Sequence, residues 1–169
     1  NYNARDWFNI ASIQAKGYAE VPSDFQASIT SYEKALLDDP SDPGIPETYG
    51  QMLLQKAQPY VRQATSGKAD SKKWANEAEK LLKRSAELHR KAVELFPRSF
   101  RSWSNLGTAM MQRGDIIALQ NDSKTAMKYY HQSNSAYRKA IEVNPAMSEA
   151  RNNISVLKSS VARLKNSEQ

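Results

Sequence analysis

Three stretches of the 169-residue sequence superimpose without a gap, and this internal repeat limits the possible folds more than any other feature. They are residues 28–40, 85–97 and 133–145. Each begins with serine, has an aromatic residue or histidine four positions later, continues through Lys-Ala and an aliphatic residue, and ends in proline. The serine lets a neighbouring helix approach and the ring fills the space beside it, while proline ends a helix because it lacks an amide donor. The pattern therefore predicts a helix that packs in the same way three times.

Apolar residues recur at helical spacing through seven segments, and no segment alternates with a period of two. We therefore expect an all-α fold without a sheet. The expected helices cover about residues 4–16, 24–39, 47–64, 71–96, 99–119, 123–144 and 147–164. Residues 39–46 are rich in turn-forming residues and predict a linker. Pro59 lies inside the third helix and is expected to kink or shorten it.

The segment between the second and third copies of the repeat points to a known family. Trp103 is followed three residues later by Leu106-Gly107, and Gly114-Asp115 comes near the expected turn. This pattern resembles the first helix of a tetratricopeptide repeat, and the repeated segments resemble its second helix. Trp7, Ile10 and Ala11 match the first helix less well. Tyr49, Met52 and Leu53 depart from it, because a large residue stands where the family prefers a small one.

The resemblance covers nearly the whole chain and implies its architecture. We expect a right-handed α-solenoid of about three helix hairpins, at residues 4–40, 46–97 and 99–145, with a capping helix at about 147–165. The distance from Trp103 to Pro145 is 42 residues, against roughly 28 in a repeat of ordinary length. The excess is two heptads, so each helix can lengthen while its buried face is kept. The sequence thus predicts that the second and third hairpins are longer than usual.

The resemblance also implies a binding site. In the family the first helices line a concave groove, and carboxamides repeated along it can bind an extended peptide backbone. Asn9, Gln51, Asn105 and Asn153 each lie two residues after the position of the tryptophan. Arg5 and Arg101 lie two residues before it and are expected to flank the groove and attract a carboxylate. The alternative is that the amides serve helix packing or bind water, and that both arginines are simply solvated.

The charges and the residue types exclude several kinds of site. The formal net charge of +6 is unevenly spread: residues 1–61 carry 4 basic and 8 acidic side chains, whereas the rest of the chain is basic. There is no cysteine, so disulfides and thiolate sites are excluded. We recognise no phosphate-binding loop, nucleophile motif or metal-ligand spacing. His89 is expected to be a packed, hydrogen-bonded histidine of the core, and His131 to lie on the surface. No enzymatic activity and no cofactor are therefore expected.

The hypothesis that these features favour is a non-catalytic protein–protein interaction module that holds a peptide or a protein face in its groove. One alternative, by analogy with the family, is a soluble appendage of a membrane or cell-envelope assembly such as polysaccharide or glycan export. The start at Asn1 rather than Met fits an excised or processed piece. A third hypothesis is binding of nucleic acid or an anionic surface by the basic helix at 71–96, although interleaved glutamates dilute its charge. Self-association through the lengthened hairpins is compatible with each of them.

Overall fold

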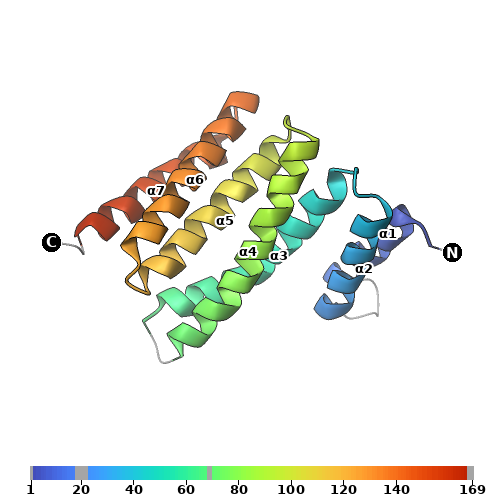
Figure 1. Cartoon of the computed structure of the whole chain (residues 1–169), viewed down its shortest axis with the longest axis horizontal. Coiled ribbons are helices and arrows are strands. Elements are labelled where there is room, and N and C mark those ends of the chain that lie inside the picture. The colour runs from blue at the N-terminus through green and yellow to red at the C-terminus, as the bar shows by residue number, and fades with distance from the viewer. Residues whose placement is uncertain (1, 18–22, 68–69, 167–169) are drawn as a thin grey trace.

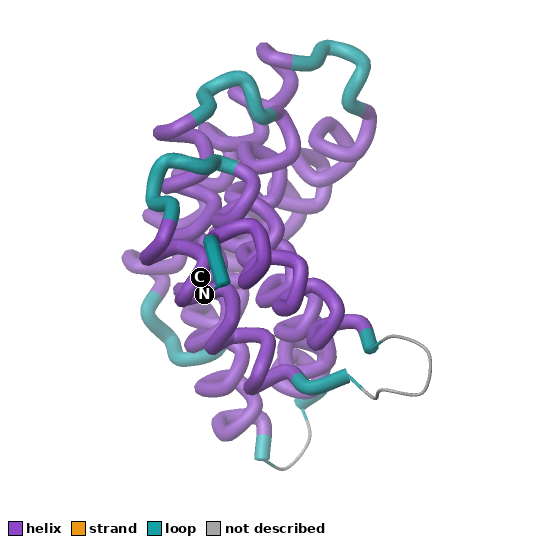
Figure 2. Tube along the Cα trace, turned by 90° about the vertical axis from the view of Figure 1, so that its right-hand side faces the viewer, coloured by secondary structure: helices purple, strands orange, loops and turns teal. Residues whose placement is uncertain are grey.

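The computed structural model describes residues 2–17, 23–67 and 70–166, and over these residues the chain forms helices and no strand. The helices are α1 (Ala4–Lys16), α2 (Phe25–Asp38), α3 (Gly44–Thr65), α4 (Ser71–Leu95), α5 (Phe100–Ala118), α6 (Ser123–Val143) and α7 (Ser148–Asn166). They follow one another in chain order across the molecule, with the two termini at opposite ends (Figure 1). Helices and connecting loops account for the whole of the described trace (Figure 2). The all-α class expected from the sequence is confirmed.

Each helix packs against the next one along the chain, and α5 also meets α3 and α7. The closest pairs are α1 with α2, α3 with α4, and α5 with α6. In addition, α3 contacts α5, and α5 contacts α7. The buried side chains form three clusters: one around α1 to α4, a central one around α3 to α6, and one around α5 to α7. Adjacent helices therefore share a continuous apolar interior.

Local signals at the helix ends explain most of the observed boundaries. The side chains of Asn3, Asp24, Ser99 and Asp122 accept hydrogen bonds from backbone amides in the first turns of their helices, which satisfies donors that a helix start leaves free. Ser99 also donates to the carboxylate of Glu47 at 2.5 Å and so ties the start of α5 to the start of α3. These caps agree with the predicted starts of the helices to within about a residue.

The third helix differs from the expectation at its start. It begins at Gly44 rather than near Glu47, so Ile45 and Pro46 belong to its first turn and are buried. A proline is tolerated there because the amides of the first turn have no intrahelical acceptor. The shortening predicted for Pro59 was wrong, since α3 continues to Thr65, and the alternative of a kink stays a prediction. The Pro59 side chain is exposed, so its ring adds no clash with the core.

The second and third hairpins are longer than the first, as the spacing predicted. Helices α1 and α2 have 13 and 14 residues, whereas α3 and α4 have 22 and 25, and α5 and α6 have 19 and 21. A polar contact in the lengthened region joins three helices. Arg113 of α5 pairs with Glu79 of α4 at 2.6 Å and donates to the hydroxyl of Tyr129 of α6 at 2.9 Å. The added turns are thus packed against one another.

Candidate binding face

The same helix crossing occurs in the two long hairpins. In α5–α6 the buried Ser133 hydroxyl donates to the backbone carbonyl of Gly107 at 2.7 Å, and a Cβ on Gly107 would lie 2.6 Å from the ring of Tyr137. In α3–α4, Ser85 donates to the carbonyl of Gly50 at 2.8 Å. A Cβ on Gly50 would lie 3.0 Å from the ring of His89. The serine and the ring of the repeated segment therefore hold a glycine of the preceding helix in each case.

This crossing corrects the alignment of α3 with the other first helices. Gly50, not Leu53, takes the place of Gly107, so Pro46 stands at the position of Trp103. A second observation agrees: the Trp103 indole donates to the carbonyl of Pro97, six residues earlier, and Pro46 also follows a proline by six residues. The expected match of Tyr49, Met52 and Leu53 was wrong by three residues. As a result Thr48, rather than Gln51, is equivalent to Asn105.

The other alignments agree with the structure. In α1, Ser12 bonds the hydroxyl of Tyr32 at 3.2 Å, as Thr108 of α5 bonds that of Tyr137 at 3.0 Å. This contact makes Ala11 equivalent to Gly107. In α7, the Arg151 guanidinium donates to the carbonyl of Pro145, six residues earlier, as Trp103 does in α5. Asn9, Asn105 and Asn153 are therefore at equivalent positions.

One side of the odd-numbered helices carries the predicted amides. We define the odd-helix face as the side of α3, α5 and α7 on which Gln58, Gln112 and Ser160 lie, together with the side of α1 on which Asn9 takes the position equivalent to Asn105. Gln58 and Gln112 exchange two hydrogen bonds at 3.0 and 3.1 Å and so join α3 to α5 on this face. Two helical turns separate Gln51 from Gln58, Asn105 from Gln112, and Asn153 from Ser160. Because seven residues return a helix nearly to the same side, all three predicted amides lie on the odd-helix face.

The predicted site residues are accessible. Asn9 and Gln51 are exposed, and Asn105 and Asn153 are half-buried. Within the described part of the chain, none of these four side chains makes a hydrogen bond. Arg5 and Arg101 are exposed, and the guanidinium of Arg101 lies 5.7 Å from the ring of Phe100. Arg101 precedes Asn105 by one helical turn and is on the same side of α5. Whether these six residues bind a ligand stays a prediction.

A pocket opens on the odd-helix face near the ends of α3, α5 and α7. Its volume is about 500 Å³. The lining combines apolar and polar side chains: Val61, Thr65, Met111, Gln112, Asp115, Ala118, Leu119, Tyr130, Ser160, Arg163 and Leu164. The face therefore offers exposed amides and a pocket two turns further along the helices.

A carboxylate and a guanidinium meet in this pocket. The Tyr130 hydroxyl donates to Asp115 at 2.8 Å, and Arg163 donates to the Ser160 hydroxyl at 3.0 Å. Burial raises the pKa of Asp115 above its ordinary value, although hydrogen bonds from Tyr130 and Ser160 and the charge of Arg163 oppose this shift. The same contacts join α5, α6 and α7. The Asp115 carboxylate can therefore accept a hydrogen bond from a ligand amide, and the Arg163 guanidinium can donate one to a ligand carbonyl.

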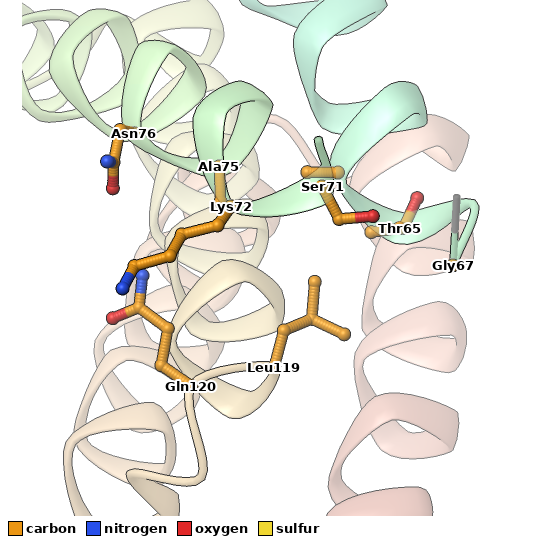
Figure 3. A pocket seen from close by; sticks show the side chains of 9 residues that line it. Thr65, Gly67, Ser71, Lys72, Ala75, Asn76, Leu119 and Gln120 are labelled. Atoms are coloured by element: carbon orange, nitrogen blue, oxygen red, sulfur yellow. The ribbon is translucent and has the colours of Figure 1, made fainter. Parts of the chain in front are cut away.

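A second cavity adjoins the first one and shares Thr65 and Leu119 with it. Its volume is about 660 Å³, and its lining comes from the end of α3, the start of α4 and the end of α5. Figure 3 shows Lys72 extending from α4 toward Gln120, and Leu119 projecting into the space between these segments. Leu119 is 53% exposed. The two cavities together extend the accessible surface around the tip of the second hairpin.

The two histidines lie in the core and on the surface as predicted, but the hydrogen bond expected for His89 is wrong, because neither ring nitrogen has a partner among the described residues. His89 is completely buried at the crossing of α3 and α4, whereas His131 is exposed on α6. Sequence analysis did not single out Asp115, Tyr130, Ser160 or Arg163 as a cluster. One signal was present, since Gly114 and Tyr130 lie seven residues from Gly107 and Tyr137 and repeat their crossing: a Cβ on Gly114 would lie 2.5 Å from the Tyr130 ring.

No protein-family model and no curated protein matches this chain. Within residues 2–17, 23–67 and 70–166, no group of three or more histidine and acidic side chains is placed to hold a metal ion. None of the helices in this part of the chain has the length and apolar character that a membrane crossing requires. The function is therefore argued from the geometry of the chain.

Proposed function

We propose that this chain is a non-catalytic binding module of the tetratricopeptide-repeat type, a right-handed α-solenoid of three hairpins and a capping helix, that holds an extended peptide segment on the odd-helix face. The observation that carries the proposal is the repeated amide. Asn9, Asn105 and Asn153 occupy one equivalent position on α1, α5 and α7, and none of their side chains has a hydrogen-bond partner among the described residues.

The contrast with the serines of the partner helices α4 and α6 supports a role of the amides outside the fold. Ser85 and Ser133 are buried, and each bonds a backbone carbonyl of the neighbouring helix. The amides make no such contact, so helix packing does not require them. An amide side chain offers one acceptor and two donors, which is what an extended peptide backbone can satisfy. Helices α5 and α7, which present two of the amides, pack against each other, so binding costs little ordering of that part of the module.

The pocket that contains Asp115 and Arg163 extends the same surface. In this proposal it receives a side chain of the bound segment, because Met111, Ala118 and Leu119 provide apolar walls beside the polar cluster. The contacts to the peptide backbone would then supply affinity that does not depend on the peptide sequence. The pocket would supply a preference for peptides whose side chain fits it. Arg101 is placed on the same side of α5 to meet a carboxylate of the segment.

The test begins with peptides selected from a random library by the wild-type chain. Affinities of several selected peptides would be measured by fluorescence anisotropy with the Asn9→Ala/Asn105→Ala/Asn153→Ala variant. We expect a loss of roughly tenfold or more, similar for peptides of different sequence, because each net hydrogen bond contributes about 1 kcal/mol. The matched control is Gln26→Ala/Asn76→Ala, which removes exposed amides from α2 and α4. Unchanged affinity in the triple variant, or an equal loss in the control, would exclude the odd-helix face as the site.

A further inference from the structure

Two grooves flank α6, and neither belongs to the odd-helix face. The first lies between α4, α5 and α6 and has a volume of about 420 Å³. Trp103, Leu106 and Met110 of α5 form its apolar floor. The charged and titratable side chains along it are Arg90, His131 and Lys139. This groove therefore has an apolar floor and a basic rim.

The second groove lies between α6 and α7 and has a volume of about 310 Å³. Its apolar lining comes mainly from Met127, Leu157 and Val161. The charged and titratable side chains around it are Tyr130, His131, Arg138, Lys158 and Lys165, of which Tyr130 also lines the pocket that contains Asp115. His131 lines both grooves, so they adjoin one another on the two sides of α6. The second groove repeats the combination found in the first.

No acidic residue lines either groove. Of the basic side chains on the rims, Lys139 pairs with Glu142 at 2.8 Å, and both of these side chains are exposed. Arg90, Arg138 and Lys158 form no ion pair with any described residue. Among the described residues elsewhere, Lys80 pairs with Glu77, Arg84 with Glu33 and Glu87, and Arg113 with Glu79, whereas the other lysines and arginines form no ion pair. The rims are thus a region where positive charge is left without compensation.

We propose that the two grooves beside α6 form a second interaction site, which takes an acidic amphipathic segment of a partner protein. Leucine-like or aromatic side chains of the segment enter the grooves and cover their floors, while its carboxylates meet Arg90, Lys139, Arg138 and Lys158. Charge complementarity identifies this occupant, because its carboxylates would pair with the arginine and lysine side chains that have no ion pair on the rims. The apolar floors distinguish it from a nucleic acid, whose phosphates would meet the rims but leave the floors uncovered.

This site does not depend on the proposed function of the odd-helix face. Arg90 belongs to α4 and Arg138 to α6, and neither lines the pocket that contains Asp115. The chain also carries a segment of the required chemistry itself, since Leu37 is 81% exposed and Asp38 and Asp39 follow it at the end of α2. A second copy is therefore the main competing occupant, and the test must separate it from another protein.

The probe is a fluorescent helical peptide with leucine and glutamate along one face. Two analogues replace either the leucines by serine or the glutamates by lysine. We expect the parent peptide to bind the wild-type chain and both analogues to bind at least roughly tenfold more weakly, since each lacks one of the two interactions. The Arg90→Glu/Arg138→Glu variant should also bind the parent peptide roughly tenfold more weakly. The charge-matched control, Lys16→Glu/Lys73→Glu, changes basic residues outside both grooves and should bind the parent peptide almost as the wild type does.

Several results would overturn the proposal. Equal binding by Arg90→Glu/Arg138→Glu and its control would mean that only the net charge matters. Equal binding of the serine analogue would show that the apolar floors are not used. A single-stranded RNA oligomer that binds more tightly than the parent peptide, and is lost in the same variant, would assign the grooves to nucleic acid. Concentration-dependent sedimentation that is lost in both Arg90→Glu/Arg138→Glu and Leu37→Ser would assign them to a second copy.

Folding of the variants is checked by circular dichroism before any binding is measured. Arg90 and Arg138 are exposed, so charge reversal is not expected to disturb the helices. If the reversed variant does not fold, the neutral variant Arg90→Gln/Arg138→Gln replaces it and should lose about half as much on a logarithmic scale of affinity. Wild-type affinity in that folded variant would contradict the proposal as well.

Discussion

The crossings of the two long hairpins use the same geometry but differ in the chemistry of one ring. In α5–α6, Tyr137 packs on Gly107, and its hydroxyl bonds that of Thr108 at 3.0 Å. In α3–α4, His89 packs on Gly50, and neither ring nitrogen has a hydrogen-bond partner among the described residues. Ser85 and Ser133 make the same bond to a glycine carbonyl in both hairpins. The two crossings therefore share the packing of a ring on a glycine. They differ in that the polar atom of Tyr137 has a hydrogen-bond partner and those of His89 have none.

This difference makes one crossing sensitive to acid. Burial lowers the pKa of His89 to about 4 from an ordinary value of 6.5, although the nearby charge of Glu47 opposes the shift. The folded state therefore binds a proton at His89 less readily than the unfolded state does. The stability that comes from the neutral ring is fully present above about pH 6.5 and is lost progressively as the pH falls to about 4. A tyrosine at the same position has no titration in that range.

The largest effect is therefore expected for His89→Tyr, which gives α3–α4 the ring of α5–α6. The free energy of unfolding of the wild type should fall between pH 6.5 and pH 4 by more than that of the variant, with a difference on the order of 3 kcal/mol. Urea denaturation at several pH values measures this directly. At pH 7 the two chains should differ by roughly 1 kcal/mol at most. Parallel curves for the two chains between pH 7 and pH 4 would show that His89 is not the source of the acid sensitivity.

A smaller effect is expected when a methyl group is added at the crossing. A Cβ on Gly107 would lie 2.6 Å from the Tyr137 ring, so Gly107→Ala should destabilise the chain by about 2 kcal/mol even after the better helix propensity of alanine is included. Gly50→Ala brings its Cβ to 3.0 Å from His89 and should cost less, roughly 1 kcal/mol or below.

Thermal or urea unfolding of both alanine variants tests this ranking. The double variant Gly107→Ala/Tyr137→Ala serves as the control, because the added methyl group should cost nothing further once the ring is removed. A larger loss of stability for Gly50→Ala than for Gly107→Ala would mean that the α3–α4 crossing adapts less easily to an added methyl group.

The smallest effect concerns the serines of the repeat. Ser133→Ala removes a buried hydrogen bond between α6 and α5 and should destabilise the chain by about 1 kcal/mol. The matched substitution Ser28→Ala removes a bond to Phe25 within the same helix, and we expect roughly half that loss. Equal losses at the two positions would indicate that the contact between helices adds nothing to the crossing.

Much of this fold was predictable from local signals. The starts of α2, α5 and α6 follow from Asp24, Ser99 and Asp122, whose side chains cap the amides nearby, and the repeated prolines mark the helix ends. Helix formation depends on groups a few residues apart, so such signals are visible in the sequence. The start of α3 was missed because Pro46 replaces the tryptophan of the other first helices. The spacing of six residues from the preceding proline would have located it.

The candidate binding face was predictable only in part. The equivalence of Asn9, Asn105 and Asn153 follows from the alignment, and the structure keeps it. That of Gln51 fails, yet Gln51 still lies on the odd-helix face because it is two turns from Gln58. The cluster of Asp115, Tyr130 and Arg163 was not predicted at all. Its members come from three helices, and no spacing along the chain relates them.

The sequence by itself determined the seven helices of the described residues, their approximate ends, the lengthening of the second and third hairpins, and the serine and ring that each repeated segment brings to its crossing. Only the tertiary structure decided the register of α3, the burial of Asp115 beside Arg163, and the grooves that leave Arg90 and Arg138 unpaired. The reason is physical. Periodicity and capping act within a few turns of one helix, whereas burial and charge pairing depend on which faces of distant helices meet when the apolar surface is removed from water.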